Sequence, residues 1–515
     1  MNKPPPRPNW RTRLWQLFGR ERDVIVAEIG PGAHDVIVGK NIIRIGALVV
    51  PALPAILALL GALTLAAFVV WWVRVPATMD TARFTIAIAD FGQLQGDQIM
   101  PSKDGQTASR TLFTTLEAEL TGTADFRPLI WHDSMSFLEK RSLIGVIQGV
   151  DAEARRRTAC ARARELNAAI LVYGYLNTDA DPPTLEQEFC IRSLKRDIGD
   201  IEEVESTNRI GSPVPVDLPL DSSDATKVSV NAPLRVRNTL LTQIVIGLNY
   251  ELSGKYDRAR RIFEDALAYL QSSREPGAKP GSDGEDVLHY FIGREHFFLG
   301  QNVERPLDER IAHFADAEAQ FEQALANPAY LRARLALGST FYQRAQLLAQ
   351  QQQPFDLEIG RAIVEQSQVL REASPTDNRA VLVQGALSLG LSHWLDGYRL
   401  LQGGDGAAAG AAFVQARSYA AFSTQWAQAD EHRFAAAAHM IDGLTYDYAA
   451  QESNRQTQSE AAQAAYRQAE SAYALCVAEG AKDRLDFFLT ERLVGDTCAP
   501  SLERVRSQII PPPGG

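Results

Sequence analysis

Three neighbouring residues, His132, Asp133 and Ser134, have the side chains of a serine-hydrolase triad. Residues that are adjacent in a chain seldom face one another as a triad requires. We therefore interpret this tripeptide as a strand-to-helix turn in which Asp133 or Ser134 caps the helix. The chain contains no P-loop, HExxH, GxSxG, GxGxxG or kinase signature. The sequence therefore predicts neither an enzyme nor a bound cofactor.

The eight histidines are scattered along the chain, and only one pair has a spacing that suggests a shared helix face. His432 and His439 lie seven residues apart, which is two helical turns. A metal site needs further ligands, and the sequence near this pair offers no third one in a recognisable pattern. We therefore assign both histidines to the core or the surface, and we predict no metal site.

The four cysteines form two local pairs. Cys160 and Cys190 lie 30 residues apart, and Cys476 and Cys498 lie 22 residues apart. An even number of cysteines in local pairs is typical of disulfides in an oxidising compartment. The alternative is four buried thiols, because cysteine is among the most buried residue types.

Residues 80–196 alternate between strand and helix patterns, which predicts a mixed sheet covered by helices. The near-continuous apolar run 84–91 is typical of a strand that is covered on both faces. The expected strands span 84–91, 126–131, 168–176 and 185–194, and the expected helices span 109–120 and 152–166.

This pattern resembles the TolB-like N-terminal domain of bacterial envelope proteins. The resemblance is carried by the opening strand that ends in Ala89-Asp90-Phe91, by the helix after it, and by the late strand that ends in Tyr173-Gly174-Tyr175. It implies an interaction and assembly module rather than an enzyme. Residues 197–237, rich in Asp, Ser and Pro, are expected to form a linker, with one added edge strand as an option.

Residues 238–510 are rich in alanine and carry a repeated code of small and large side chains. In the first unit, Gly247 on one helix precedes Ala259, Phe263 and Ala266 on the next. The code returns at Ala317, Phe321 and Ala324, at Ala409, Phe413 and Ala416, and at Ala462, Tyr466 and Ala469. One unit departs from it, with Gln366 and Val369 after Ala362. The pattern resembles tetratricopeptide repeats (TPR), which are helical hairpins of about 34 residues that stack into a solenoid.

Residues 45–74 are predicted to form a single transmembrane helix, because 45–73 is uncharged, and Trp71 and Trp72 near its end precede Arg74. A buried core helix is the alternative. Residues 1–44 form a short segment in which Asp23-Val-Ile-Val recurs from Asp35, as in a small β-hairpin. Residues 1–45 hold eight basic and four acidic side chains, which gives this segment a net charge of +4. The whole chain has a net charge of −11, so the residues after 45 carry −15. This asymmetry favours a single-pass protein of the inner membrane, with its N-terminus in the cytoplasm and its C-terminal domains outside the cytoplasm.

The expected fold class is therefore a membrane-anchored, multi-domain chain with one transmembrane helix, a small TolB-like α/β domain and an all-α, TPR-like solenoid. The acidic exterior argues against nucleic-acid binding, because phosphate contacts need clustered Lys and Arg. We predict a scaffold or adaptor that binds proteins; the alternative is a transmembrane sensor that signals to a separate cytoplasmic partner. Self-association is left open. By analogy with TPR proteins, the predicted protein-binding groove contains Arg294, Phe297, Tyr342 and Gln343.

Overall fold

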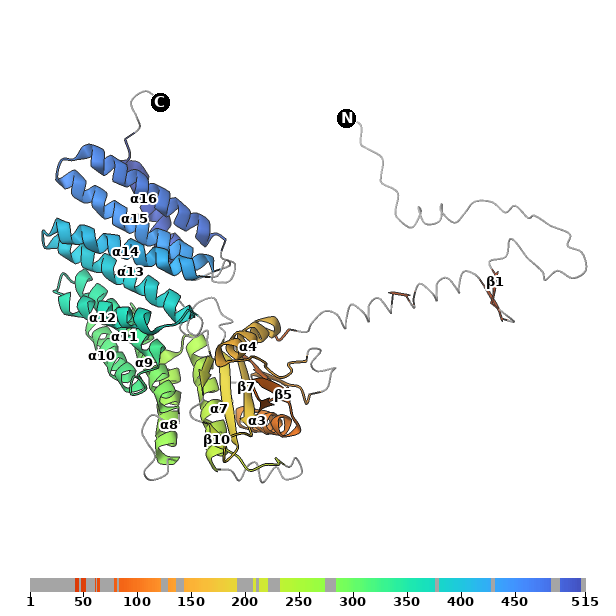
Figure 1. The fold of residues 1–515 in the computed structure, drawn as a ribbon. Coiled ribbons are helices and arrows are strands. Elements are labelled where there is room, and N and C mark those ends of the chain that lie inside the picture. The colour runs from red at the N-terminus through yellow and green to blue at the C-terminus, as the bar shows by residue number, and fades with distance from the viewer. Residues whose placement is uncertain are drawn as a thin grey trace, which may run out of the picture. The chain divides into compact units, whose positions relative to one another are not determined.

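The chain divides into two compact units, Met1–Pro76 and Ala77–Gly515, and each is described here by itself (Figure 1). The computed structural model describes residues 42–45, 48–51, 61, 63–64, 78–80, 83–121, 128–135, 143–191, 207–209, 213–220, 232–273, 284–375, 379–427, 431–482 and 491–510.

The described part of the first unit begins with a short hairpin. Strand β1, Ile42–Ile45, pairs antiparallel with β2, Leu48–Pro51. Residues 48–51, which open the predicted transmembrane helix, are therefore extended. β-branched side chains suit a strand as well as an apolar helix, so the uncharged run alone did not distinguish the two. The predicted hairpin built on the repeats that begin at Asp23 and Asp35 lies outside the described residues.

No helix among the described residues is long and apolar enough to cross a membrane. Within 52–74, only residues 61, 63 and 64 are described, and they are helical. The predicted membrane-anchored fold class is therefore wrong. The structure supports a helical-repeat array together with a small mixed sheet.

The second unit begins with a mixed sheet in the order β10-β8-β7-β3-β6, with β9 beside β8 and with β4 joining β7 to β5. β3 is parallel to β6 and β7, whereas β8 is antiparallel to its neighbours. The hairpin of β4 and β5 was not predicted. The strands are β3 Thr85–Ile88, β4 Gly92–Gln95, β5 Gln98–Pro101, β6 Leu129–His132, β7 Ile170–Asn177, β8 Thr184–Ile191, β9 Thr207–Arg209 and β10 Val214–Pro215.

The two faces of this sheet contact different helices. Ile86 and Ile88 lie in a core with Leu112 and Leu116 of α3, Lys103–Thr121. Their neighbours Ala87 and Ala89 point to the opposite face, which α4, Ala152–Leu166, covers. Alternation of side chains along a strand explains this division. The α4 boundaries are those that the sequence predicted.

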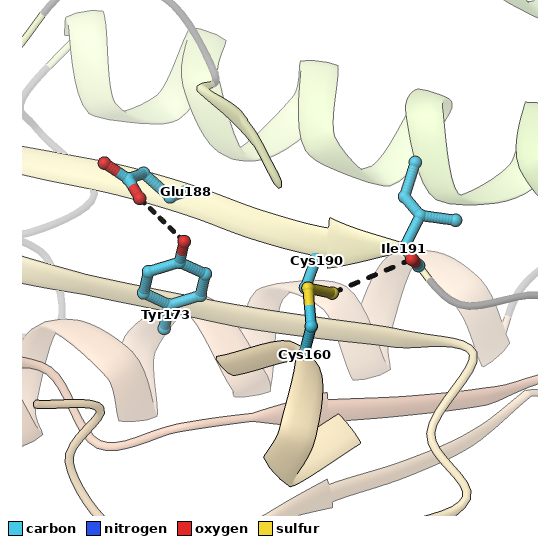
Figure 2. The surroundings of a disulfide bond; sticks show 5 residues. All are labelled: Cys160, Tyr173, Glu188, Cys190 and Ile191. Atoms are coloured by element: carbon cyan, nitrogen blue, oxygen red, sulfur yellow. Dashed lines mark hydrogen bonds between the residues drawn. A yellow bond between two sulfur atoms is a disulfide. The ribbon is translucent and has the colours of Figure 1, made fainter. Parts of the chain in front are cut away.

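A disulfide crosslinks α4 to the sheet. Cys160 of α4 bonds to Cys190 of β8, with their Cα atoms 5.6 Å apart (Figure 2). On the same strand pair, the Tyr173 hydroxyl donates a hydrogen bond of 2.7 Å to the buried Glu188 carboxylate. The disulfide therefore fixes a helix to strands that come later in the chain.

The rest of the unit is a solenoid-like array of antiparallel helices, each contacting its sequence neighbours (Figure 1). Its first helix starts at Ala232, inside the predicted linker. The helices are α7 Ala232–Leu252, α8 Tyr256–Ser273, α9 Glu285–Gln301, α10 Leu307–Ala324, α11 Leu331–Gln350, α12 Asp356–Glu372, α13 Arg379–Gln402, α14 Gly406–Trp426, α15 His432–Arg455, α16 Ser459–Gly480, the π-helix η1 Glu491–Cys498, and α18 Ala499–Gln508.

Glycines facing aromatic rings set the close approach within the hairpins. A Cβ atom added at Gly247 would lie 2.5 Å from the Phe263 ring, so only glycine fits there. Equivalent pairs recur along the array as Gly293 with Phe321, Gly397 with Phe413, and Gly443 with Tyr473. The last pair uses Tyr473 rather than Tyr466 of the sequence code. The repetition makes the array compatible with TPR geometry.

The unit that departs from the code contains a polar contact at the aromatic position. A Cβ at Gly338 would meet Gln366, not an aromatic ring. Gln366 is buried, and its Oε1 accepts a hydrogen bond of 2.7 Å from the buried Ser392 hydroxyl of α13. The glutamine therefore joins the third hairpin to the fourth.

The C-terminal end of the array is closed by a disulfide and a buried carboxylate. Cys476 of α16 bonds to Cys498, with Cα atoms 6.3 Å apart. Asp447 of α15, only 2 % exposed, accepts hydrogen bonds from Tyr473 and from the Arg504 guanidinium of α18. The Asp447 carboxylate raises the pKa of Arg504 above its usual value. This ion pair was not predicted.

Candidate functional site

A cavity of about 900 Å³, which we call the polar cavity because most of its lining residues are polar, opens at the edge of the sheet where β3 and β6 end. In open α/β sheets, ligands bind preferentially at the carboxyl ends of parallel strands. His132 is the last residue of β6, and Asp90 follows β3 by two residues. The lining residues are Asp90, Pro101, Lys103, Gln106, Thr107, Arg110, Thr111, Thr114, His132, Asp133, Ser134, Leu143, Gly145 and Val146.

The hydrogen bonds of His132 determine its tautomer. The Ser134 backbone N–H donates to Nδ1 at 3.1 Å, so Nδ1 is the unprotonated nitrogen in the neutral ring. The other nitrogen, Nε2, lies 3.1 Å from the Ser109 hydroxyl, which itself donates to the Gln106 carbonyl. Nε2–H therefore donates to Ser109, with the Asp90 carboxylate 3.4 Å away. The ring also stacks on Phe113 at 5.4 Å, so His132 ties β6 to α3.

The exposed Ser134 hydroxyl lies 2.8 Å from Nδ1 of His132. Ser134, His132 and Asp90 thus form a connected chain of hydroxyl, imidazole and carboxylate. The Nδ1 lone pair is already shared with a backbone N–H, which weakens it as a base toward the hydroxyl. This geometry suits a rigid polar wall better than an activated nucleophile.

Asp133 holds the loop that forms the opposite wall of the cavity. Its two carboxylate oxygens accept hydrogen bonds from the backbone N–H groups of Ile144, at 2.9 Å, and Gly145, at 2.6 Å. The Asp90 N–H donates to the Gly145 carbonyl. The predicted turn at 133–134 is present, and Asp133 also binds this distant loop. The helix that Asp133 or Ser134 was predicted to cap lies outside the described residues.

One face of α3 supplies the remaining wall. Lys103, Gln106, Arg110 and Thr114 follow one another at helical spacing, and all four are exposed. The cavity therefore has two cationic side chains on the helix side and the Asp90 carboxylate on the sheet side. Such an arrangement can bind a small polar ligand, or a polar side chain of a partner, that carries both an acceptor and a donor.

The predicted groove residues occupy different environments. Arg294 is 1 % exposed, and its NH2 donates to the Glu251 carboxylate at 2.8 Å. Phe297 and Tyr342 are buried in the main core. Gln343 is half-buried. Of the four, Gln343 is therefore the position best suited to testing the groove.

Arg294 also sits among buried carboxyl groups. Burial, with the neighbouring Glu251 as the next cause, raises the pKa of Glu295 well above its usual value. The Arg294 guanidinium acts in the opposite direction and partly offsets this rise in the pKa of Glu295. The buried Arg294–Glu251 ion pair links α9 to α7, and removal of one partner would leave the other charge buried without its counter-ion.

His432 and His439 lie near different carboxylates. His432 Nδ1 lies 3.0 Å from the Glu479 carboxylate, and His439 Nδ1 lies 4.0 Å from that of Asp442. Neither belongs to a group of three ligands among the described residues.

Sequence reasoning missed the roles of Asp90 and Ser109 beside His132. The signal available was a polar residue after a buried strand, since parallel neighbours end at the same edge of a sheet. Ser109 could not be found this way, because only the packing of α3 brings it to His132. Comparison of the whole chain with protein-family models and with curated proteins found no match.

Proposed function

We propose that this chain is a protein-binding scaffold of an oxidising, extracytoplasmic compartment, in which TPR-type hairpins and a TolB-like α/β domain assemble a complex. The first helices of the hairpins form the binding surface, and the α/β domain supplies a second contact. The strongly acidic composition after residue 45 favours a protein partner over nucleic acid.

The observation that carries this proposal is the apolar core shared by the sheet and the array. Leu240 and Leu241 of α7 belong to the same buried cluster as Ile86 of β3 and Leu112 of α3. The Asp104 carboxylate of α3 also accepts a hydrogen bond of 2.8 Å from the N–H of Leu220, in the segment between the sheet and α7. A scaffold needs its two contact surfaces held at a fixed geometry, and a shared core supplies that.

The two disulfides support the proposed compartment. Structural disulfides form and persist in extracellular, periplasmic and similar spaces, and are rare where thiols are kept reduced. Each bond closes a helix onto a neighbouring element, which is a structural rather than a redox role.

Site-specific photo-crosslinking in the native cell tests the scaffold proposal. A photoreactive residue at Gln343 on α11 should crosslink the full chain to a partner polypeptide. The same probe at Leu357, which is 70 % exposed on the outer helix α12, is the matched control and should give no adduct. Equal crosslinking at both positions, or none at Gln343 in a chain with an unchanged melting temperature, would contradict the proposal.

A sensor is the second candidate, and the position of α3 between the cavity and the helical array favours it. One face of α3 lines the polar cavity, whereas Leu112 and Leu116 on the other face share a core with α7. A ligand that orders Arg110 and Lys103 would therefore act directly on the helix that contacts the array. Ligand binding should slow hydrogen exchange in α7 as well as in α3, and protection confined to α3 would argue for a local binding role.

A further inference from the structure

Two imidazoles and a carboxylate converge between α9 and α10, outside the polar cavity. Nδ1 of His296 on α9 lies 3.2 Å from Nδ1 of His313 on α10. The same His296 nitrogen lies 3.4 Å from the Asp316 carboxylate. All three potential ligand atoms lie within 4.8 Å of one another.

These separations match the edges of a metal-centred tetrahedron. Zinc binds imidazole nitrogen and carboxylate oxygen at about 2.0–2.2 Å, so two ligands of a tetrahedral ion lie about 3.3 Å apart. His313 and Asp316 are three residues apart on α10 and thus share one face of the helix. His296 reaches the same point from α9, so an ion there would join both helices of the second hairpin.

Burial prepares the imidazoles as ligands. Desolvation lowers the pKa of His296 to about 4, and it also lowers the pKa of His313. Both rings are therefore neutral at pH 7, with lone pairs available for a metal. The charged groups that act on them are Asp257 and Arg260 from α8, Arg305 from the loop, and Asp316 from α10.

Arg305 is the group that opposes a metal ion here. Its NH1 lies 3.4 Å from Nε2 of His313, a contact that requires the proton to be on Nδ1. Metal binding at Nδ1 moves the proton to Nε2, so NH1 must turn away. Two carboxylates are placed to hold the guanidinium, since Asp257 lies 2.6 Å from NH2 and Glu309 lies 3.6 Å from NH1.

We propose that His296, His313 and Asp316 form a binding site for a divalent transition-metal ion, with zinc as the best match. Two imidazoles favour zinc over calcium or magnesium, which prefer all-oxygen ligands. Asp316 is 59 % exposed, so the fourth ligand is a water molecule on the solvent side. The ion clamps α9 to α10, and the site is independent of the scaffold proposal.

Zinc titration of the untagged full-length chain by calorimetry tests this site. The wild-type chain should bind one zinc ion at this site, and His313→Ala and Asp316→Asn should each weaken the binding at least tenfold. Asp316 is exposed, so Asp316→Asn keeps the test valid if His313→Ala fails to fold. Arg305→Gln should tighten binding severalfold, because it removes the competing cation.

His439→Ala is the matched control. His439 and Asp442 share the three-residue helical spacing of His313 and Asp316 but belong to no three-ligand group in the described part of the chain. This variant should bind zinc like the wild type. Cobalt substitution should give the intense visible absorption of a tetrahedral ion, which Asp316→Asn should diminish. Unchanged zinc affinity in both ligand variants, or an octahedral cobalt spectrum, would overturn the proposal.

Discussion

The α/β domain and the helical array differ in the sequence separation of the contacts that hold each of them together. In the sheet, Thr85 pairs with Leu129 and Ile86 pairs with Ile170, so distant segments must come together before the core exists. In the array, each helix mainly contacts its sequence neighbours. A sheet of this kind is expected to unfold as one unit, whereas a repeat array can lose its end and keep its beginning.

The two disulfides lie on opposite sides of this difference. Cys160–Cys190 closes 30 residues within the α/β domain, and Cys476–Cys498 closes 22 residues at the last hairpin. Similar loops should give similar stabilisation. The structure around each disulfide, rather than the size of the loop it closes, therefore determines how many elements are destabilised when the bond is lost.

The largest expected effect comes from Phe263, which belongs to the core that both regions share. Phe263→Ala should destabilise the protein by about 3–5 kcal/mol, because a fully buried ring is replaced by a cavity. Urea unfolding and hydrogen exchange of the full chain measure this effect. Exchange should rise in α8 and in the sheet but much less in α16. Equal acceleration in α16 would contradict a nearest-neighbour array. Leu357→Ala, at a position 70 % exposed, is the control.

The disulfides provide the sharpest comparison of the two regions. Replacing either pair with serines should cost about 3 kcal/mol in the chain-entropy description. Loss of Cys160–Cys190 should speed exchange throughout α4, β7 and β8. Loss of Cys476–Cys498 should speed it in α16 and α18 and leave α8 protected. Exchange maps that coincide for the two variants would remove the distinction between the regions.

Ser392 tests the polar contact between the third and fourth hairpins. Ser392→Ala should cost about 1–3 kcal/mol, because Gln366 Oε1 loses the hydrogen bond that satisfies it in the core. The loss should appear as faster exchange in α12 and α13. Ser418→Ala, which removes an exposed hydroxyl bonded within α14, is the control. A cost as small as that of the control would show that Gln366 does not couple the hairpins.

The smallest expected effect is electrostatic and lies at the end of the array. The Lys482 ammonium, 2.6 Å away, is the main group that lowers the pKa of Glu479, with His432 also contributing. The folded pKa lies below the unfolded value, so this stabilisation is present above the usual Glu range and is lost as the pH falls through the folded pKa. Glu479→Gln should cost less than about 1 kcal/mol at pH 7.

Denaturant unfolding at neutral and acidic pH checks the sign of this effect. The cost of Glu479→Gln should shrink in acid, and Lys482→Gln should show the same trend. A cost that grows as the pH falls would contradict the assignment of this ion pair.

Local patterns were most informative where the physical cause is also local. The helix at 152–166 was predicted from spacing, because an apolar stripe and capping residues act within a few turns. The recurring alanines and Phe263 marked the hairpins, although the last glycine faces Tyr473 rather than Tyr466. That shift depends on how far one helix slides along the next, which no single-helix pattern records.

For the apolar run at 45–74, composition alone was not sufficient to predict the secondary structure. A long uncharged segment satisfies several structures, and pairing with a neighbouring strand placed residues 48–51 in a hairpin. The sequence likewise contained the polar residues of the cavity without indicating that they would meet.

The alternation of strands and helices, the repeat and the local pairs of cysteines could all be predicted from the order of residues in the chain. Packing between elements is what brings Asp90 and Ser109 to His132 at one edge of the sheet, and His296 to His313 and Asp316. The physical reason is that hydrophobic periodicity reports which face of an element is buried, whereas a site depends on which two buried faces contact each other.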